Sequence, residues 1–455
     1  GTQNTAVGAN ALDAVTTASG NSAFGYQSMT SPMTLQAFNT ALQRHGTMSL
    51  GQILQPAIDY CINGFAVRPR VLGFWLQPAQ AGRIERVAVV NKLDAARKIY
   101  LSENGALLNV GDILKNPDMG RLYQRIANEG IGIFYDGDVA DFIVADMKAN
   151  GGLLAKDDLV DCAPTDLAPL IGNYRGFEVA TNQLPGGGLM TLEMLNILEH
   201  FDLATMGHNL AQYIATVAEA MKYATIDKDQ FMGDPSFIDV PQDLLASKAR
   251  AAEIAAKIRA GEKADIVRLN LGAPESKDTT HLVVADAAGN VVNVTHSLGS
   301  SSGVITDGLG FMYNNCMMVF DPRPGHVGSL ASGKARFTAM CPTILSKDGK
   351  PFLALGAPGG TTITMGVLQT ILNAVDFRMS AQDAVSAPRF CATSNVIELT
   401  NRIFRGVERD LNKEGYETRR YAASYVTPIV HAIRFRDGIL DGGADPAGDG
   451  MAASC

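Results

Sequence analysis

Hydroxyl side chains stand at the start of an apolar run in the stretch at 278–284, which reads DTTHLVV. A threonine hydroxyl is a poor nucleophile until a base takes its proton. A threonine at the start of a chain carries its own base, because its α-amino group titrates near about 7.7 and is partly neutral at physiological pH. In the intact chain the nitrogen of Thr279 is bonded to Asp278, so this chemistry requires the protein to cut itself first. On composition alone, Thr279 is simply a β-branched residue that leads a strand.

The pair Gly359-Gly360 is a second candidate, because glycine leaves backbone N–H groups accessible to a developing negative oxygen. A Gly-Gly pair alone is weak evidence for such a site. Six cysteines form no CxxC pair and seven histidines form no HExxH spacing, so the sequence predicts no metal. We expect most of the cysteines to be small buried apolar residues.

Charge and hydropathy exclude other classes of function. The net charge is −8 and the sequence pI is about 5.4. Both nucleic acid and an acidic membrane need a basic surface, so we expect neither as a partner. No run of 18 or more apolar residues is present, so the sequence predicts no segment that spans a bilayer. The chain begins at Gly1 without a basic-then-apolar leader, which leaves a cytoplasmic or periplasmic location open.

The elements that would position Thr279 change character along the chain. The 455 residues suffice for one large domain or for two to three smaller ones. Apolar residues at helical spacing indicate a helix-rich front half, and the loop at 184–188 (LPGGG) opens a predicted helix at 189–201. Tyr174–Thr181 alternates like a strand. The region 247–268 is typical of a solvated helix followed by a linker.

Strands dominate the back half. The runs 281–286 and 291–298 flank AAGN, whose Gly and Asn favour a tight hairpin turn. A further strand is predicted at 352–355, followed by the Gly359-Gly360 loop and a helix at about 362–375. Residues 1–30 are small and polar, and GTQNTAVGANAL is loosely echoed by GNSAFGYQSM. Two turns of a repeat and an irregular leader both fit this segment.

The stretch at 278–290 (DTTHLVVADAAGN) resembles the autoprocessing site of γ-glutamyltranspeptidases, in which the first Thr of TTH becomes a new N-terminus. Further segments match that family in the same order, from about residue 34 to the C-terminus. They are YRG at 174–176, LNILE at 195–199, EAMK at 219–222, GDP at 233–235, VP at 240–241, NN at 314–315, MCPT at 340–343, APGG at 357–360 and APRF at 387–390.

The resemblance implies an α+β fold, the four-layer αββα sandwich of N-terminal-nucleophile hydrolases. It implies cleavage between Asp278 and Thr279, so that a leader at 1–30 and a large-subunit region at 31–278 separate from a small-subunit region at 279–455. The two regions would form one intertwined domain and stay together as a heterodimer. Whether two heterodimers pair is left open.

Roles within the site also follow from the resemblance. Thr279 would be the nucleophile, with its freed amine as the base. Thr295 and Ser297 would orient it from one strand face, although both also fit ordinary strand residues. Gly359 and Gly360 would form the oxyanion hole.

Several positions depart from the family's pattern, and they concern the substrate. Gly299 stands where an asparagine is expected, Cys316 where Gln or Glu is expected, and Val319 in place of the aspartate that binds a substrate α-amino group. Thr338 falls where the family has a serine near the substrate carboxylate, and Ala339 replaces the serine after it. A buried cationic amine would lack a counter-charge here, which is unfavourable.

Nearby basic residues favour an acidic substrate instead. The motif FDPRPG at 320–325 is similar to that of family members outside the true transpeptidases, which include oxamate amidohydrolases and cephalosporin acylases. Arg336 is our candidate for pairing with a substrate carboxylate, with Arg323 and Lys334 nearby. A surface charge or a structural ion pair is an equally good interpretation of each residue.

The sequence therefore predicts a self-processing hydrolase of a small-molecule amide, carboxylate-bearing, that works through a Thr279 acyl-enzyme without cofactor or metal. One alternative is a γ-glutamyl hydrolase or transpeptidase acting on glutathione. Another is an uncleaved, non-catalytic binding protein.

The N-terminal region departs from the family as well. Residues 8–14 (GANALDA) are faintly similar to an early helix of the family, and the segment expected between them and Ser31 is missing. A variant with a shortened N-terminus and a fragment both fit this pattern.

Overall fold

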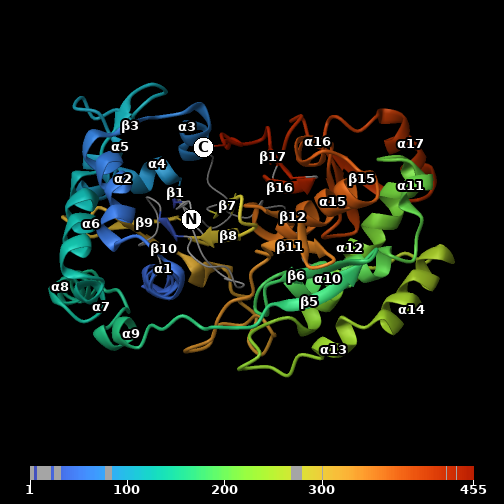
Figure 1. Cartoon of the computed structure of the whole chain (residues 1–455), viewed down its shortest axis with the longest axis horizontal. Helices are drawn as coiled ribbons and strands as arrows, with labels where there is room; N and C mark the ends of the chain where they lie inside the picture. The colour runs from blue at the N-terminus through green and yellow to red at the C-terminus, as the bar shows by residue number, and fades with distance from the viewer. Residues whose placement is uncertain are drawn as a thin grey trace. The chain divides into compact units, whose positions relative to one another are not determined.

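The computed structural model describes residues 5–7, 22–24, 32–76, 85–267, 279–299, 301–426, 428–436 and 438–454. The chain forms two compact units (Figure 1). The first comprises residues 1–166 and 296–315, and the second comprises residues 167–295 and 316–455. The second unit therefore contains residues from both sides of the Asp278–Thr279 bond, of which Asp278 lies outside the described residues.

Short helices and short strands make up the first unit. Its helices are α1 Pro32–His45, α2 Leu50–Asn63, α3 Pro69–Trp75, α4 Arg86–Val90, α5 Asp94–Tyr100, α6 Pro117–Glu129, α7 Gly132–Tyr135, α8 Asp138–Ala149 and α9 Lys156–Val160. Its strands are β1 Thr5–Val7, β2 Ser22–Phe24, β3 Phe65–Ala66, β4 Ile113–Leu114, β9 Ser301–Ile305 and β10 Met312–Asn314.

The second unit holds the longest of the described helices and strands. Its helices are α10 Gly188–Leu198, α11 Leu203–Met206, α12 Ala211–Phe231, α13 Gln242–Leu245, α14 Lys248–Arg259, α15 Ile363–Val375, α16 Ala381–Ser386 and α17 Arg405–Lys413, with 3-10 turns η1 Cys316–Val319 and η2 Gly360–Thr362. Its strands are β5 Leu170–Tyr174, β6 Phe177–Thr181, β7 Thr279–Ala285, β8 Val291–Ser297, β11 Thr343–Lys347, β12 Lys350–Gly356, β13 Phe390–Cys391, β14 Val396–Leu399, β15 Glu417–Arg420, β16 His431–Arg436 and β17 Ile439–Ala444.

A six-stranded antiparallel sheet organises the second unit, in the order β17-β16-β12-β11-β6-β5. Alternate residues of a strand face opposite sides of a sheet, and β12 illustrates this. Leu353 and Leu355 point into an apolar core shared with the helices, whereas Gly356 meets His281 of β7. Helices α10, α15 and α16 contact the sheet, and the β7–β8 ribbon lies against β12 and β16 (Figure 1). The result is a layer of helices, a sheet and a second β layer.

The predicted hairpin at 281–298 is confirmed as β7 and β8. Its turn is closed by Asp286, whose carboxylate accepts the Asn290 N–H at 2.8 Å. Gly289 has a φ of 85°, which only glycine adopts without strain. The predicted strand at 352–355 and the helix at about 362–375 are confirmed as β12 and α15.

The single strand predicted at Tyr174–Thr181 is wrong, because the chain reverses within it. Arg175 and Gly176 have φ values of 51° and 78°, and they form a two-residue turn between β5 and β6. The unusual conformation of Arg175 is held by long-range contacts: its N–H donates to Glu199 at 2.7 Å and its guanidinium bonds Asp376 at 3.2 Å. Alternation along the sequence cannot reveal contacts of this kind.

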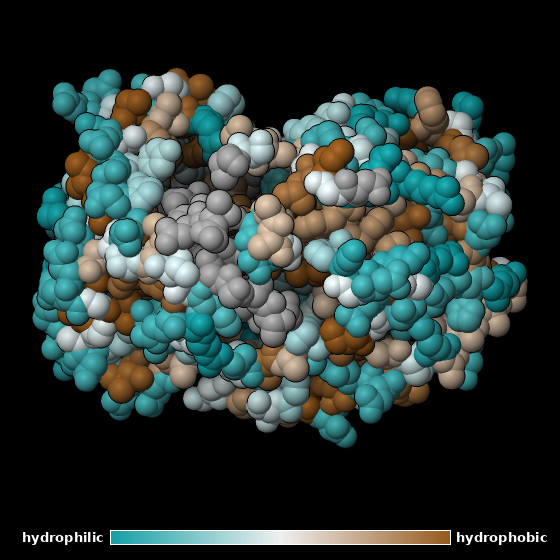
Figure 2. Space-filling view, viewed as in Figure 1, coloured by the Kyte–Doolittle hydropathy of each residue, from teal (hydrophilic) through white to brown (hydrophobic). Residues whose placement is uncertain are grey.

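Of the leader at 1–30, the described part is β1 and β2, which pair in parallel with Thr5 opposite Ser22. The rest of the predicted leader or repeat lies outside the described residues. Among the helices that the structure describes, none is both long and apolar enough to cross a membrane. The face shown in Figure 2 is mainly hydrophilic, with its apolar residues in small separate groups.

Glu193 is an acidic residue in the core. It belongs to α10, and every residue of that helix is buried. Within the described part of the chain, neither oxygen of its carboxyl group has a hydrogen-bond partner. Burial raises the pKa of Glu193 well above its usual range, and the nearby Asp227 adds to the effect, while Arg250 opposes it. A raised pKa favours the neutral form of Glu193 in the folded protein.

The variant Glu193→Gln should therefore change how stability depends on pH. A carboxyl group with a raised pKa in the folded state contributes stability below its unfolded pKa, near about 4.3, and loses it as pH rises toward the folded value. Urea unfolding at pH 4, 6 and 8 should show that the free energy of unfolding of the variant increases relative to that of the wild type as pH rises. Exposed Glu262→Gln is the control, and parallel curves for Glu193→Gln and wild type would contradict a buried neutral carboxyl.

Candidate active site

Thr279 is the first residue of β7 and is half-buried. The adjacent strand β8 carries Thr295, whose side chain is 1% exposed. The two threonines thus belong to neighbouring strands of one two-stranded ribbon. The short turn at 286–290 brings these strands together, so local sequence alone sets up this half of the site.

His281 connects the two strands. Its Nδ1 lies 2.8 Å from Thr295 Oγ1 in a buried hydrogen bond, and its Nε2 has no partner among the described residues. Burial lowers the pKa of His281 well below its usual range, so the ring is neutral. A neutral imidazole can fix the direction of the Thr295 hydroxyl without bringing a charge into the core. Sequence reasoning named this histidine only as a letter of the TTH motif and assigned it no role.

The ring of His281 also fixes β7 against the sheet. A Cβ added to Gly356 would lie 2.3 Å from its Cε1, so only glycine leaves room for the imidazole. Thr279 is two residues from His281, and therefore about 7 Å along the strand from this contact. Gly359 follows Gly356 by three residues. The start of β7 and the glycine loop after β12 therefore each lie within three or four residues of this contact along the chain.

The Gly359-Gly360 loop has a backbone that requires glycine, with φ values of 154° and 64°. The carbonyl of Gly359 accepts the Thr362 hydroxyl at 2.9 Å, at the start of the turn that leads into α15. In a planar trans peptide the N–H points opposite to the carbonyl, so the Gly360 N–H points away from Thr362. This orientation is compatible with the oxyanion role predicted for it.

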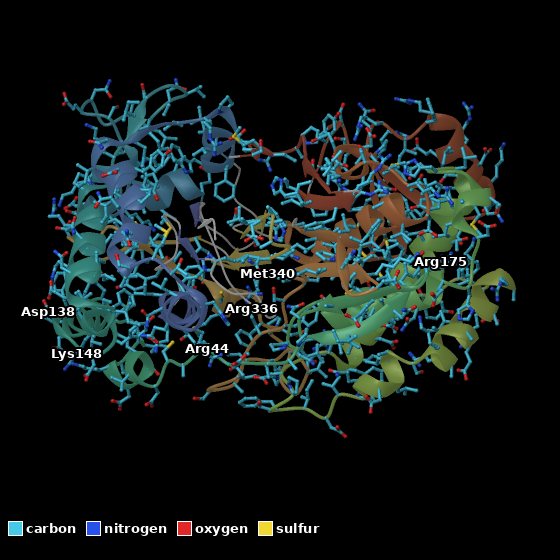
Figure 3. All side chains as sticks on the ribbon, in the orientation of Figure 1. Arg44, Asp138, Lys148, Arg175, Arg336 and Met340 are labelled. Atoms are coloured by element: carbon cyan, nitrogen blue, oxygen red, sulfur yellow. The ribbon has the colours of Figure 1, made fainter. Side chains whose placement is uncertain are left out.

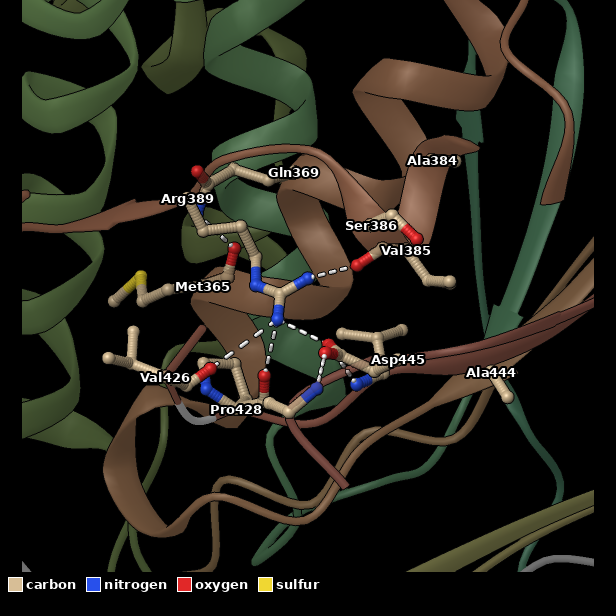
Figure 4. A network of polar contacts seen from close by, with 12 residues as sticks. Met365, Gln369, Ala384, Val385, Ser386, Arg389, Val426, Pro428, Ala444 and Asp445 are labelled. Atoms are coloured by element: carbon tan, nitrogen blue, oxygen red, sulfur yellow. Dashed lines mark hydrogen bonds and ion pairs between the residues drawn. The ribbon is translucent and has the colours of Figure 1, made fainter. Parts of the chain in front are cut away.

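A buried ion pair supports that loop through Pro428, which packs on Gly359. Arg389 and Asp445, 5% and 1% exposed, are joined by a salt bridge (Figure 4). Arg389 also donates to the Pro428 carbonyl at 2.8 Å, and Asp445 accepts the Val430 N–H at 3.0 Å. Pro428 in turn packs on Gly359, where an added Cβ would lie 2.6 Å from its ring. Sequence reasoning placed Arg389 in a motif but did not find its partner.

The last two residues of β8, His296 and Ser297, fall in the first unit, as does Gly299. The Gly299 N–H donates to Ser297 Oγ at 2.9 Å. Gly299 has a φ of 66°, a conformation that asparagine also tolerates better than most residues. This backbone requirement explains why glycine can stand where the resemblance leads us to expect asparagine.

The predicted substrate-binding residues of the second unit lie on two further segments. Cys316 and Val319 bound η1, and neither is fully buried. The Thr338 N–H donates to the Pro185 carbonyl at 2.8 Å, which ties this segment to the turn that opens α10. Ala339 is adjacent to that turn, because a Cβ on Gly187 would lie 2.6 Å from its carbonyl oxygen.

The basic residues near this segment differ in how their charges are used. Arg323 is exposed and forms an ion pair with Asp321 at 2.6 Å, which lowers the pKa of that carboxyl to about 2. Lys334 donates to the Val327 carbonyl at 2.7 Å. Arg336 is half-buried and donates to the Phe337 carbonyl at 3.2 Å. Arg323 therefore fits the interpretation as a structural ion pair. Arg336 stays a candidate for pairing with a substrate carboxylate.

The buried pair behind the glycine loop generates a stability prediction. Asp445→Ala leaves Arg389 as an uncompensated buried charge, which should lower the free energy of unfolding by about 3–5 kcal/mol. Asp410→Ala, which breaks the exposed pair with Lys413, should stay within about 1 kcal/mol of wild type. Urea unfolding of the three proteins tests this, and similar losses for both variants would show that the Arg389–Asp445 pair does not anchor the loop.

Comparisons with known proteins agree with this architecture. Acylase ACY 1 proenzyme of Pseudomonas sp. (strain SE83) is 36% identical over 430 residues, covering 94% of this chain and 75% of that protein. Glutathione hydrolase proenzyme of Escherichia coli (strain K12) is 35% identical over 375 residues, covering 79% of this chain and 63% of that protein. The crystal structure of cephalosporin acylase from Bacillus halodurans superposes with a TM-score of 0.82 at 26% identity, covering 93% of this chain and 77% of that one.

The structural likeness confirms the predicted α+β fold of the N-terminal-nucleophile hydrolase type. The family model of the γ-glutamyltranspeptidases matches residues 2–455, which is nearly the whole chain. With the ordered motifs, the glycine loop and the β7–β8 ribbon, this match shows that the chain belongs to the γ-glutamyltranspeptidase family.

Proposed function

We propose that this protein is a self-processing amide hydrolase in which Thr279 is first the agent of cleavage and then the catalytic nucleophile. The observation that carries the proposal is the position of Thr279 at the head of β7, on the strand that His281 fixes to Thr295 and to Gly356. That arrangement supports the proposal because it ties the strand headed by Thr279 to a second hydroxyl and to the residue three positions before the glycine loop.

In the proposed cleavage, Thr279 Oγ attacks the carbonyl carbon of Asp278. A C–O bond forms, the C–N bond breaks, and the hydroxyl proton ends on the nitrogen of Thr279. Water then hydrolyses the ester, which leaves a carboxylate on Asp278 and a free α-amino group on Thr279. The products are residues 1–278 and 279–455, which stay together as a heterodimer.

The freed amine supplies the base for the second reaction. It takes the hydroxyl proton as Oγ attacks a substrate amide, and the proton passes to the leaving amine. Water then releases the acyl group from Oγ. The N–H groups of the Gly359-Gly360 loop would stabilise the oxyanion in both steps, a contribution typically worth about 10²–10³ in rate for one donor.

Two kinds of relative support this reaction class. Both the acylase ACY 1 and the glutathione hydrolase are named as proenzymes, which agrees with a chain that matures by cleavage. The likeness to a cephalosporin acylase supports acyl transfer from an amide. No cofactor enters the proposed chemistry.

We further propose that the substrate is a small-molecule amide bearing a carboxylate. Val319 and Cys316 leave the η1 segment without the acid that would pair with a substrate ammonium group. Arg336 remains as a cation two residues before Thr338 in the chain, and Figure 3 shows it well away from Arg175, whose charge is engaged by Asp376.

The alternative function is a γ-glutamyl hydrolase or transpeptidase, and the 35% identity to a glutathione hydrolase favours it. Two substrates separate the alternatives, because glutaryl-p-nitroanilide and γ-glutamyl-p-nitroanilide differ only in the α-amino group. Faster release of p-nitroaniline from the γ-glutamyl compound would favour the alternative. A protein that stays as one band on a denaturing gel and hydrolyses neither compound would instead be a binding protein.

Replacement of the nucleophile should abolish both reactions. Thr279→Ala should remain a single full-length chain on a denaturing gel, whereas wild type should give two fragments, the smaller beginning TTHLVV by Edman sequencing. Thr280→Ala is the matched control and should be cleaved normally. Full hydrolysis of glutaryl-p-nitroanilide by Thr279→Ala would exclude this residue as the nucleophile.

Replacement of Arg336 should affect acidic substrates selectively. Arg336→Ala should raise the KM for glutaryl-p-nitroanilide about tenfold or more, which corresponds to the loss of a charge-assisted hydrogen bond. The KM for pentanoyl-p-nitroanilide, which has a methyl group in place of the carboxylate, should not change. Arg323→Ala should leave both constants unaltered because its charge is matched by Asp321. An unchanged KM for the acidic amide in Arg336→Ala would remove Arg336 from the substrate site.

A further inference from the structure

Two buried polar atoms on the β7–β8 ribbon lack a hydrogen-bond partner of good geometry within the described residues. They are His281 Nε2 and Asn293 Oδ1. The two residues are 6% and 5% exposed, so bulk water does not reach these atoms. Leaving one buried polar atom without a partner is unfavourable, and two of them on neighbouring strands of one ribbon require a physical explanation.

The side-chain amide of Asn293 is fixed in one orientation. Its Nδ2 donates to the carbonyls of Thr343 at 2.8 Å and Leu355 at 3.0 Å, which are paired residues of β11 and β12. A carbonyl oxygen only accepts, so a flipped amide would place its own oxygen against two others. Oδ1 is therefore an acceptor that points away from these two carbonyls and needs a donor.

The register of the hairpin places Asn293 next to His281. The Asp286 N–H donates to the Asn290 carbonyl at 3.1 Å, and this pairing puts His281 opposite Thr295, in agreement with their hydrogen bond. Asn293 is two residues from Thr295 on β8, so it shares a face with Thr295 and is the diagonal neighbour of His281. Diagonal neighbours on one face are within reach of a ring or a long side chain.

The sheet that packs on the ribbon brings the same two side chains together. Asn293 donates to the Leu355 carbonyl, and the ring of His281 occupies the space above Gly356, the next residue of β12. Burial and, after it, His431 lower the pKa of His281, whereas Asn293 raises it as a hydrogen-bond acceptor does. The acceptor on Asn293 and the nitrogen on His281 are therefore complementary partners.

A pair of the same kind occurs elsewhere in the second unit. Asn373 on α15 donates from Nδ2 to the Ala384 carbonyl at 3.0 Å, and its Oδ1 lies 3.0 Å from His208 Nε2. The backbone carbonyl again orients the amide, so the amide oxygen must accept and the histidine Nε2 must carry the proton. A buried asparagine thus fixes the tautomer of a neutral histidine at a second place in the fold.

We propose that Asn293 is a positioning residue whose Oδ1 accepts the Nε2–H of His281 and thereby fixes the tautomer of that ring. With the proton on Nε2, Nδ1 is an acceptor, so Thr295 must be the donor in the 2.8 Å hydrogen bond between them. Asn293 thus determines, through His281, the direction in which the Thr295 hydroxyl points.

This direction matters to the chemistry of Thr279, and here the inference rests on the proposed function. A Thr295 hydroxyl that donates to His281 has only lone pairs to offer to other groups. The freed amine of Thr279 can donate an N–H to such an acceptor and keep its own lone pair for the proton of Thr279 Oγ. In the other tautomer the Thr295 hydrogen would be released, and it would compete for that lone pair.

The tautomer of His281 can be observed directly by nuclear magnetic resonance. Protein labelled with nitrogen-15 in histidine should show a proton on Nε2 of the His281 ring and none on Nδ1, with the signals assigned by their loss in His281→Gln. In Asn293→Ala the preference should disappear, and the ring should populate both tautomers. Thr295→Val removes the partner of Nδ1 but keeps Asn293, so His281 should stay protonated on Nε2.

The same substitution should affect turnover but not substrate binding. Asn293→Ala should lower the kcat for glutaryl-p-nitroanilide, per cleaved molecule, about tenfold, as the loss of one hydrogen bond would give, while KM stays unchanged. Asn373→Ala is the matched control, because it removes a buried asparagine that contacts a histidine and a backbone carbonyl in the same way. It should leave kcat and the His281 tautomer as in wild type.

A proton on Nδ1 of His281 in wild type, or an unaltered tautomer in Asn293→Ala, would overturn the inference while leaving the proposed function intact. Loss of the Nε2 proton in Thr295→Val would also overturn it, because Thr295 would then set the tautomer. So would an equal fall of kcat in Asn373→Ala, which would show a general effect. A wild-type protein with His281 protonated on Nε2 that neither cuts itself nor hydrolyses the amide would overturn the proposed function alone.

Discussion

The contact between His281 and Gly356 is the constraint on which the rest of the site depends. The imidazole occupies the space that any Cβ at residue 356 would fill, so β7 can approach β12 only because residue 356 is glycine. The same ring holds Thr295 across the ribbon at 2.8 Å. One side chain therefore sets the depth of β7 on the sheet and the direction of a hydroxyl in β8. Its low pKa follows from this burial, and a neutral ring avoids the cost of a desolvated charge.

Two of the buried charge pairs in the second unit hold irregular backbone. Arg389 and Asp445 fix the Pro428 and Val430 peptides, and Glu219 fixes the Ala264 peptide. Loops have backbone groups that no helix or sheet satisfies, and a paired buried charge can satisfy several of them at once. This is a reasonable use of an ion pair whose net contribution to stability is otherwise small because of desolvation. The Arg389–Asp445 pair supports Pro428, which packs on the glycine loop that the proposed chemistry needs in a defined place.

The positions that distinguish this chain from the family's pattern retain the backbone while changing the chemistry. Gly299 has the left-handed conformation that asparagine also tolerates, and Val319 ends the η1 turn without contributing a charge. A scaffold that keeps the proposed nucleophile strand and glycine loop would accommodate the proposed carboxylate-bearing substrate by exchange of a few side chains. This separation of scaffold from pocket agrees with relatives that include both an acylase and a glutathione hydrolase at similar identity.

Local sequence was sufficient for the β7–β8 hairpin and for α15, because their turn residues and apolar spacing depend only on near neighbours along the chain. The ordered motifs were sufficient for the family. The split of Tyr174–Thr181 into two strands involves tertiary contacts, because Arg175 has a positive φ at the turn and is held there by Glu199 and Asp376. The Arg389–Asp445 pair and the His281–Gly356 contact were likewise decided in three dimensions. A buried charge or ring needs a partner, but no pattern in the sequence says which distant residue the fold will bring to it.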